Sequence, residues 1–129
     1  MTNPARPRVL IVDDESLVCW SVAETLADAG YDVAKASDAE SAVGAFSDPA
    51  GRPDVVLLDL FLSDSTDLRV LSTLHELSPL TPIVIMTAHG SPELRMDARR
   101  LGASAVVDKP IDMSALAPLV AGVLAARPH

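Results

Sequence analysis

The sequence has a single cysteine, few basic residues and no long apolar run, and each shortage excludes a class of protein. One cysteine, Cys19, forms neither an internal disulfide nor a CxxC metal or redox motif. The 10 Lys and Arg face 18 Asp and Glu, and a net charge of −8 argues against unaided nucleic-acid binding, which needs basic side chains at the phosphates. No apolar stretch approaches the ~20 residues of a membrane span, and no charged-then-apolar leader opens the chain.

The length and the apolar content together favour a single folded domain. With 129 residues, 49% of them apolar, the chain is long enough to bury roughly two-thirds of its unfolded surface without disulfides or metals as supports. We therefore expect one acidic, cytoplasmic domain over residues 1–129, with a folded core from about residue 8 to about residue 126. The ends, residues 1–7 and 127–129, are expected to fray.

Four short apolar runs and one weaker segment predict five strands, and such runs are typical of strands buried on both faces of a parallel sheet. The second predicted strand is the weakest and the third is the strongest. In chain order they are Val9–Val12, Asp32–Ala36, Val55–Leu58, Ile83–Met86 and Ala105–Val107.

Segments with helical periodicity alternate with these runs. Gly30 and Gly102 are suited to positions just after a helix, and Pro92 fits a first turn. The predicted helices are Ser16–Ala29, Asp38–Phe46, Leu68 to near Pro79, Pro92–Leu101 and Met113–Ala126. Five strands alternating with five helices predict an α/β fold, a single doubly wound (βα)5 domain with helices on both faces of the sheet.

Polar residues with complementary chemistry follow four of the five predicted strands. Because the carboxyl ends of parallel strands meet at one edge of the sheet, where ligands bind, these side chains are expected to form one site. Three clustered carboxylates need a cation or shifted pKa values, and an all-oxygen ligand set favours Mg²⁺. The residues are Asp13, Asp14, Asp59, Thr87 and Lys109.

Such a site is suited to receiving a phosphoryl group. A carboxylate attacks phosphorus to form an acyl phosphate, while a metal, a hydroxyl and an ammonium stabilise the phosphoryl oxygens. We predict Asp59 as the nucleophile because it ends the most buried strand. Thr87 and Lys109 then supply the hydroxyl and the ammonium.

Four segments resemble the signature blocks of response-regulator receiver domains, in the order and spacing of that family. They are Val9–Glu15 (VLIVDDE), Val55–Leu60 (VVLLDL), Ile83–Ala88 (IVIMTA) and Gly102–Pro110 (GASAVVDKP). The resemblance covers essentially the whole chain. It implies a flavodoxin-like sheet in the strand order 2-1-3-4-5.

The resemblance also assigns roles at the acidic end of the sheet. It implies that Asp59 is the phosphoacceptor, and that Asp13, Asp14, Asp59 and the main-chain carbonyl of Phe61 bind Mg²⁺, with Mn²⁺ as an alternative ion. Flanking roles beside the phosphoryl group fall to Phe61 and His89.

The same resemblance extends to the switch residues and the partners. Thr87 becomes the switch hydroxyl, Lys109 the phosphate-pairing residue, and the Lys109–Pro110 peptide bond is expected to be cis. The implied partner is a sensor histidine kinase or a phosphotransfer protein. Receivers also pair through the fourth helix, fifth strand and fifth helix, which leaves a homodimer open.

Two positions depart from the receiver pattern. Ser63 stands where the family has proline, with no glycine after it, so the loop that follows Asp59 is less constrained. Val106 stands where the family has an aromatic ring that turns inward, and valine is short and stiff. We expect the phosphorylation chemistry to be retained and the conformational output to differ.

Several alternatives remain open from the sequence. Residues 13–15 alone could be an acidic helix-capping turn, and Asp64 and Asp67 are better explained by capping or solvation than by metal binding. A haloacid-dehalogenase-like phosphatase needs a second aspartate at the position that Phe61 occupies. A binding-only receiver, whose output does not depend on phosphorylation, is the other alternative.

The output of the chain is not predicted. No DNA-binding, ATPase or cyclase sequence follows the receiver-like segment, so we expect either a stand-alone regulator or a receiver taken from a longer protein. Leu17–Tyr31 (LVCWSVAETLADAGY) is similar to the first helix of receivers in nitrogen-regulation-type activators. Trp20 lies off the apolar stripe of that helix, and its sequence fits packing against a neighbouring helix and exposure equally well.

Overall fold

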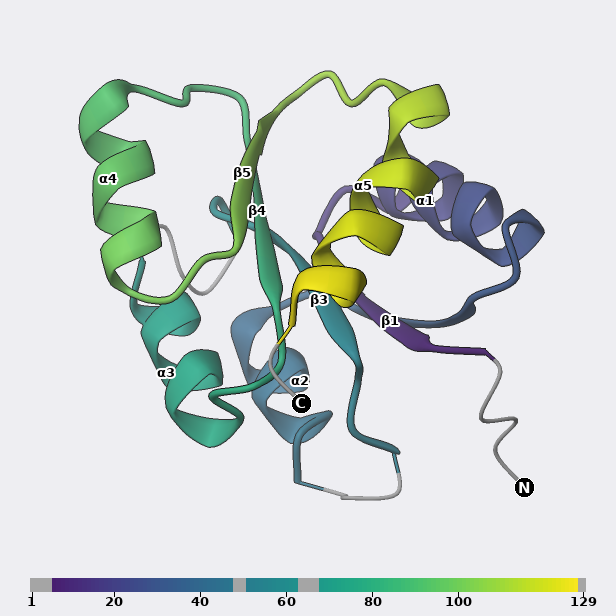
Figure 1. The fold of residues 1–129 in the computed structure, drawn as a ribbon, viewed down its shortest axis with the longest axis horizontal. Helices are drawn as coiled ribbons and strands as arrows, with labels where there is room; N and C mark the ends of the chain where they lie inside the picture. The colour runs from purple at the N-terminus through teal and green to yellow at the C-terminus, as the bar shows by residue number, and fades with distance from the viewer. Residues whose placement is uncertain (1–5, 48–50, 63–67, 128–129) are drawn as a thin grey trace.

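Five parallel strands form one sheet in the computed structural model, which describes residues 6–47, 51–62 and 68–127 (Figure 1). The strand order is β2-β1-β3-β4-β5, so β3 lies at the centre and β2 and β5 are the edges. This confirms the predicted fold and strand order. The strands are β1 (Arg8–Val12), β2 (Asp32–Ala36), β3 (Val55–Asp59), β4 (Ile83–Thr87) and β5 (Ala105–Asp108).

Helices cover both faces of the sheet. In Figure 1, α1 and α5 lie on one side of the strands, and α2, α3 and α4 lie on the other. The helices are α1 (Ser16–Asp28), α2 (Ala39–Gly44), α3 (Arg69–Leu77), α4 (Pro92–Arg100) and α5 (Met113–Ala126).

Two apolar clusters fill the space between the sheet and its helices, because successive strand side chains point to opposite faces. Leu10, Leu58 and Ile85 belong to the cluster that includes residues of α2, α3 and α4. Their chain neighbours Ile11 and Leu57 belong to the other cluster, which includes residues of α1 and α5. The central strands are therefore buried on both faces, as their continuous apolar runs predict.

The helix ends differ slightly from the predicted ones, for local reasons. Helix α1 stops at Asp28 because Gly30 adopts a positive φ of 98°, which turns the chain away from the helix. Helix α2 is shorter than predicted and is capped by Asp38, whose side chain accepts a hydrogen bond from the Ser41 amide at 2.8 Å. Pro92 occupies the first turn of α4, as expected.

Helix α1 presents apolar side chains to solvent as well as to the core. Trp20 is 56% exposed and Leu17 is 75% exposed, which decides the question that the sequence left open for Trp20.

Cys19 is buried, and burial together with the nearby Asp13 charge raises the pKa of its thiol, although Lys35 opposes the shift. Among the described residues, no helix has both the length and the apolar character needed to cross a membrane.

Candidate functional site

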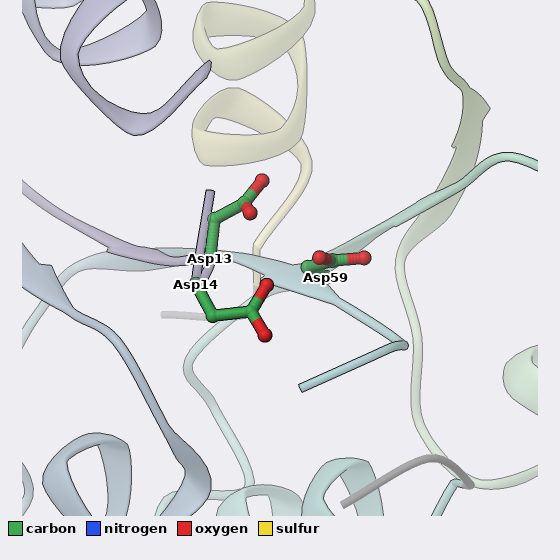
Figure 2. Close-up of side chains that lie close together, drawn as sticks. All are labelled: Asp13, Asp14 and Asp59. Atoms are coloured by element: carbon green, nitrogen blue, oxygen red, sulfur yellow. The ribbon is translucent and has the colours of Figure 1, made fainter. Parts of the chain in front are cut away.

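Three carboxylates meet at the carboxyl ends of β1 and β3 (Figure 2). The parallel register pairs Val12 with Leu58, so the residues that follow, Asp13 and Asp59, come out of the sheet side by side. One carboxylate oxygen from each of Asp13, Asp14 and Asp59 lies within 4.8 Å of the others. Asp13 and Asp59 are 2% and 3% exposed, whereas Asp14 is exposed to solvent.

Lys109, just beyond the end of β5, supplies the positive charge of this cluster. Its Nζ lies 3.0 Å from Oδ2 of Asp13 and 3.2 Å from Oδ2 of Asp59. Burial alone would lower the pKa of Lys109, but the hydrogen bonds and charges of Asp13 and Asp59 outweigh burial and raise it. The ammonium is therefore held in its charged form between two buried carboxylates.

The Asp59 carboxyl experiences opposing influences. Burial raises its pKa, the Phe61 amide that donates to Oδ1 at 3.3 Å lowers it, and the Asp13 charge raises it again. Lys109 lowers it through charge and a hydrogen bond, yet the net direction is upward. A carboxylate in this setting is poorly solvated and close to a like charge, so a second cation at the cluster would be strongly stabilised.

Thr87 ends β4, the strand beside β3, and its side chain is fully buried. The register pairs Asp59 with Met86, so Thr87 lies one residue further toward the acidic edge. Its Oγ1 accepts a hydrogen bond from the His89 amide at 3.2 Å, and its carbonyl accepts one from the Lys109 amide at 2.8 Å. The hydroxyl is thus tied to the β4–α4 loop, and the Thr87 backbone is tied to Lys109.

The other predicted site residues differ in exposure. Phe61 is 49% exposed and His89 is exposed. Val106 is half-buried and packs against the apolar core cluster between the sheet and α2, α3 and α4. The Lys109–Pro110 peptide bond is cis. The loop departure at Ser63 and the residues Asp64 and Asp67 lie outside the described part of the chain.

A groove of about 520 Å³ adjoins the cluster on the α1 side. Glu15 and Lys109 line it, together with Ala88 of the β4–α4 loop and with residues of α1 and of the segment after β5. The apolar lining residues include Leu17, Val18 and Ile111.

Sequence reasoning missed two features of the site region. Glu15 reaches Lys109, with Oε1 3.9 Å from Nζ, so it is a third carboxylate beside the ammonium, after those of Asp13 and Asp59. Arg95 in α4 lies 2.6 Å from Asp108, the residue before Lys109. The Glu15 contact could have been suspected from the place of Glu15 directly after Asp13 and Asp14. The contact between Arg95 and Asp108 depends on how α4 packs against β5, and no local sequence pattern indicates it.

Comparison with known proteins identifies the family. The sequence model described as "Response regulator receiver domain" matches residues 9–121. The chain belongs to the response-regulator receiver family. The receiver is the signalling module of two-component phosphorelay systems, and the fold and strand-end blocks described above agree with that membership.

Individual relatives and solved structures agree. This receiver is 33% identical over 109 residues to "Regulatory protein AtoC" of Escherichia coli (strain K12), covering 84% of this chain and 23% of AtoC. It is 34% identical over 110 residues to the nitrogen assimilation regulatory protein NtrX of Azorhizobium caulinodans, covering 84% of this chain and 24% of NtrX. It therefore spans about a quarter of the length of these two regulators.

Two solved structures match the receiver over most of both chains. The receiver domain of NtrX from Brucella abortus matches with a TM-score of 0.83 and 32% identity, over 92% of this chain and 98% of that chain. A CheY-like receiver domain protein from Methanospirillum hungatei matches with a TM-score of 0.87 and 26% identity, over 93% and 94%. The similarity of Leu17–Tyr31 to the first helix of nitrogen-regulation-type activators predicts that this receiver comes from such a protein. That origin stays a prediction.

Proposed function

We propose that this receiver accepts a phosphoryl group on Asp59 and thereby switches between two conformations for signalling. The observation that carries the proposal is the position of the Asp59 carboxylate, buried, 3.2 Å from the Lys109 ammonium and within 4.8 Å of two further carboxylates. Structural requirements of the fold do not call for three carboxylates at one edge of a sheet. A phosphoryl-transfer site does, because a divalent cation neutralises them and binds the incoming phosphate.

The donor set fits Mg²⁺. Carboxylates of Asp13, Asp14 and Asp59 together with the main-chain carbonyl of Phe61 are hard oxygen ligands, and an incomplete protein shell suits an ion that keeps several waters. Mn²⁺ accepts the same ligands. When bound, the ion would neutralise charge on the phosphoryl oxygens and on the acceptor carboxylate.

The chemistry assigned to the side chains is a phosphoryl transfer from a phosphohistidine. An oxygen lone pair of Asp59 forms the new O–P bond, the P–N bond breaks, and its electron pair returns to the imidazole of the donor, which then takes up a proton. Lys109 pairs with one phosphoryl oxygen and the Thr87 hydroxyl donates to another. The product is an acyl phosphate that water later hydrolyses.

The test is intact mass spectrometry after incubation with acetyl phosphate and Mg²⁺. The wild-type chain should gain one phosphoryl group and Asp59→Asn should gain none. Asp54→Asn is a matched control, because Asp54 is a partly exposed aspartate at the opposite end of β3 and should not affect the modification. No gain in the wild type, or an equal gain in Asp59→Asn, would contradict the proposal.

Two other functions are distinguished by the same samples. A haloacid-dehalogenase-like phosphatase would turn over a phosphomonoester, but its general acid would have to lie where this receiver has Phe61. A binding-only receiver would form no Asp59 adduct, or would form one without any structural response to it. We propose that the receiver does not act as a turnover enzyme but catalyses only its own phosphorylation and dephosphorylation.

The proposed partner is a sensor histidine kinase or a phosphotransfer protein. The apolar groove is lined by Lys109, whose ammonium contacts Asp59, so a donor seated there would lie next to the residue that pairs with the proposed acceptor. A homodimer through α4, β5 and α5 is proposed from the family alone, as are a cytoplasmic location and a single domain over residues 1–129 with its core at about 8–126. We propose that this receiver itself binds neither nucleic acid nor a membrane.

A further inference from the structure

Arg95 links α4 to β5, the strand that precedes Lys109. On α4, its guanidinium donates to the Val106 carbonyl at 3.1 Å and to Oδ2 of Asp108 at 2.6 Å. Strand β5 is an edge strand, so the bond to Val106 satisfies a carbonyl that no further strand covers. We call the contacts of Arg95 with Val106 and Asp108 the arginine clasp.

Gly90, in the β4–α4 loop, packs directly against the arginine clasp. A Cβ built on Gly90 would lie 2.6 Å from Oδ1 of Asp108 and 2.8 Å from Nη2 of Arg95, so a larger residue there would require these two side-chain ends to shift. The loop therefore cannot move toward the clasp without displacing it, and moving away would uncover both side chains.

The loop and β5 directly adjoin the two residues assigned to the phosphoryl oxygens, Thr87 at the end of β4 and Lys109 after β5. Gly90 is three residues after Thr87, whose hydroxyl is tied to the loop through the His89 amide. Asp108 directly precedes Lys109, whose amide donates to the Thr87 carbonyl. A shift of the Thr87 hydroxyl toward a phosphoryl group would therefore act, through its bond to the His89 amide, on the loop segment that contains Gly90.

We propose that Arg95 is a positioning residue that holds the β4–α4 loop against β5 and opposes the phosphorylated conformation. The clasp couples the loop to β5 at the position where Val106 lacks a large ring. This inference rests on the proposed function of Asp59. Since both partners of the ion pair are partly exposed, we expect the coupling to be modest, a few-fold in affinity, and therefore readily overcome by phosphorylation.

The test measures the affinity of beryllofluoride, a phosphoryl mimic, in the presence of Mg²⁺. Arg95→Gln removes the guanidinium, and Gly90→Ala displaces the two side-chain ends of the clasp without changing any charge. Both variants should bind beryllofluoride about threefold more tightly than the wild type. Asp97→Asn is the control, because Asp97 forms an exposed pair with Arg100 on the same helix at 3.6 Å and should leave the affinity unchanged.

A second measurement separates positioning from general loosening of the fold. Amide hydrogen exchange should become faster at residues 88–91 and 105–108 in both variants, while β1 and β3 keep their protection. Arg95→Lys should give an intermediate affinity because it keeps the charge but loses the two-pronged geometry. Unchanged or weaker binding in Arg95→Gln and Gly90→Ala would overturn the inference. If the wild type itself binds no beryllofluoride, the proposed function fails, and the inference fails with it.

Discussion

Replacing the proposed phosphoacceptor should stabilise the folded receiver. In Asp59→Asn the side chain keeps its size and can still accept a hydrogen bond from Lys109, but it no longer carries a charge that burial and Asp13 disfavour. The charges of Asp13 and Asp14 each repel Asp59 across at most 4.8 Å, which is worth about 3.5 kcal/mol per pair at an effective dielectric of about 20. The Lys109 attraction at 3.2 Å is worth about 5 kcal/mol on the same scale.

The two repulsions together exceed the attraction by roughly 2 kcal/mol, and solvent screening of the exposed Asp14 reduces that difference. We therefore expect Asp59→Asn to raise the free energy of unfolding by about 1–2 kcal/mol at pH 7. The assay is urea denaturation with EDTA, monitored by circular dichroism. Asp97→Asn, which alters an exposed ion pair far from the cluster, should change it by less than about 0.5 kcal/mol.

The pH dependence follows from the direction of the pKa shift. The pKa of Asp59 is raised in the folded state, whereas in the unfolded chain the pKa of an aspartate is near 3.9. Between these two pKa values the folded protein binds more protons than the unfolded chain, so the contribution of Asp59 to stability falls as the pH rises between them. The advantage of Asp59→Asn should therefore be present at pH 7 and shrink as the pH falls toward about 4. An asparagine variant that is equally or less stable at pH 7 in EDTA would refute the reasoning.

Three further predictions concern the same region and the core. Lys109→Met should lower the free energy of unfolding by about 3 kcal/mol in EDTA, because it leaves Asp13 and Asp59 buried without their cation. Added Mg²⁺ should restore part of the loss, and a urea titration that gives wild-type stability in EDTA would contradict this prediction. Phe61→Asn should speed hydrolysis of the acyl phosphate several-fold, because it removes the half-exposed ring that shields the acyl phosphate from water. The decay rate of the phosphorylated protein measures this effect, and an unchanged rate would reject the shielding role of Phe61. Leu57→Ala should cost about 2–5 kcal/mol, read from the urea midpoint, because Leu57 is fully buried in the central strand; a loss below about 1 kcal/mol would mean that the core collapses into the space left.

The fold and the acidic cluster were predictable because both follow from local patterns plus one rule of parallel sheets. Continuous apolar runs mark strands buried on both faces, and strands that run in parallel bring their last residues to one edge. Asp13 and Asp59 are 46 positions apart in the sequence, yet each directly follows or ends a buried run, so their proximity required no knowledge of side-chain packing.

The remaining contacts could not be predicted because they depend on the placement of whole helices and on side-chain conformations. Arg95 and Asp108 meet only because α4 lies at a particular angle and height beside β5. The exposure of Trp20 likewise depends on how α1 is rotated against the sheet, and its periodicity did not determine that. Residues 63–67 lie outside the described part of the chain, so the consequence of the missing proline stays a prediction.

The exposed Trp20 gives this receiver a built-in optical probe. It is the only tryptophan in the sequence, and its indole lies on the solvent side of α1, one helical turn into the element that follows Asp13 and Asp14. A protein that covers this helix would remove water from the indole and shift its emission to shorter wavelength, without any dye or tag. Titration of a candidate donor protein against the unlabelled receiver could therefore be followed by fluorescence alone.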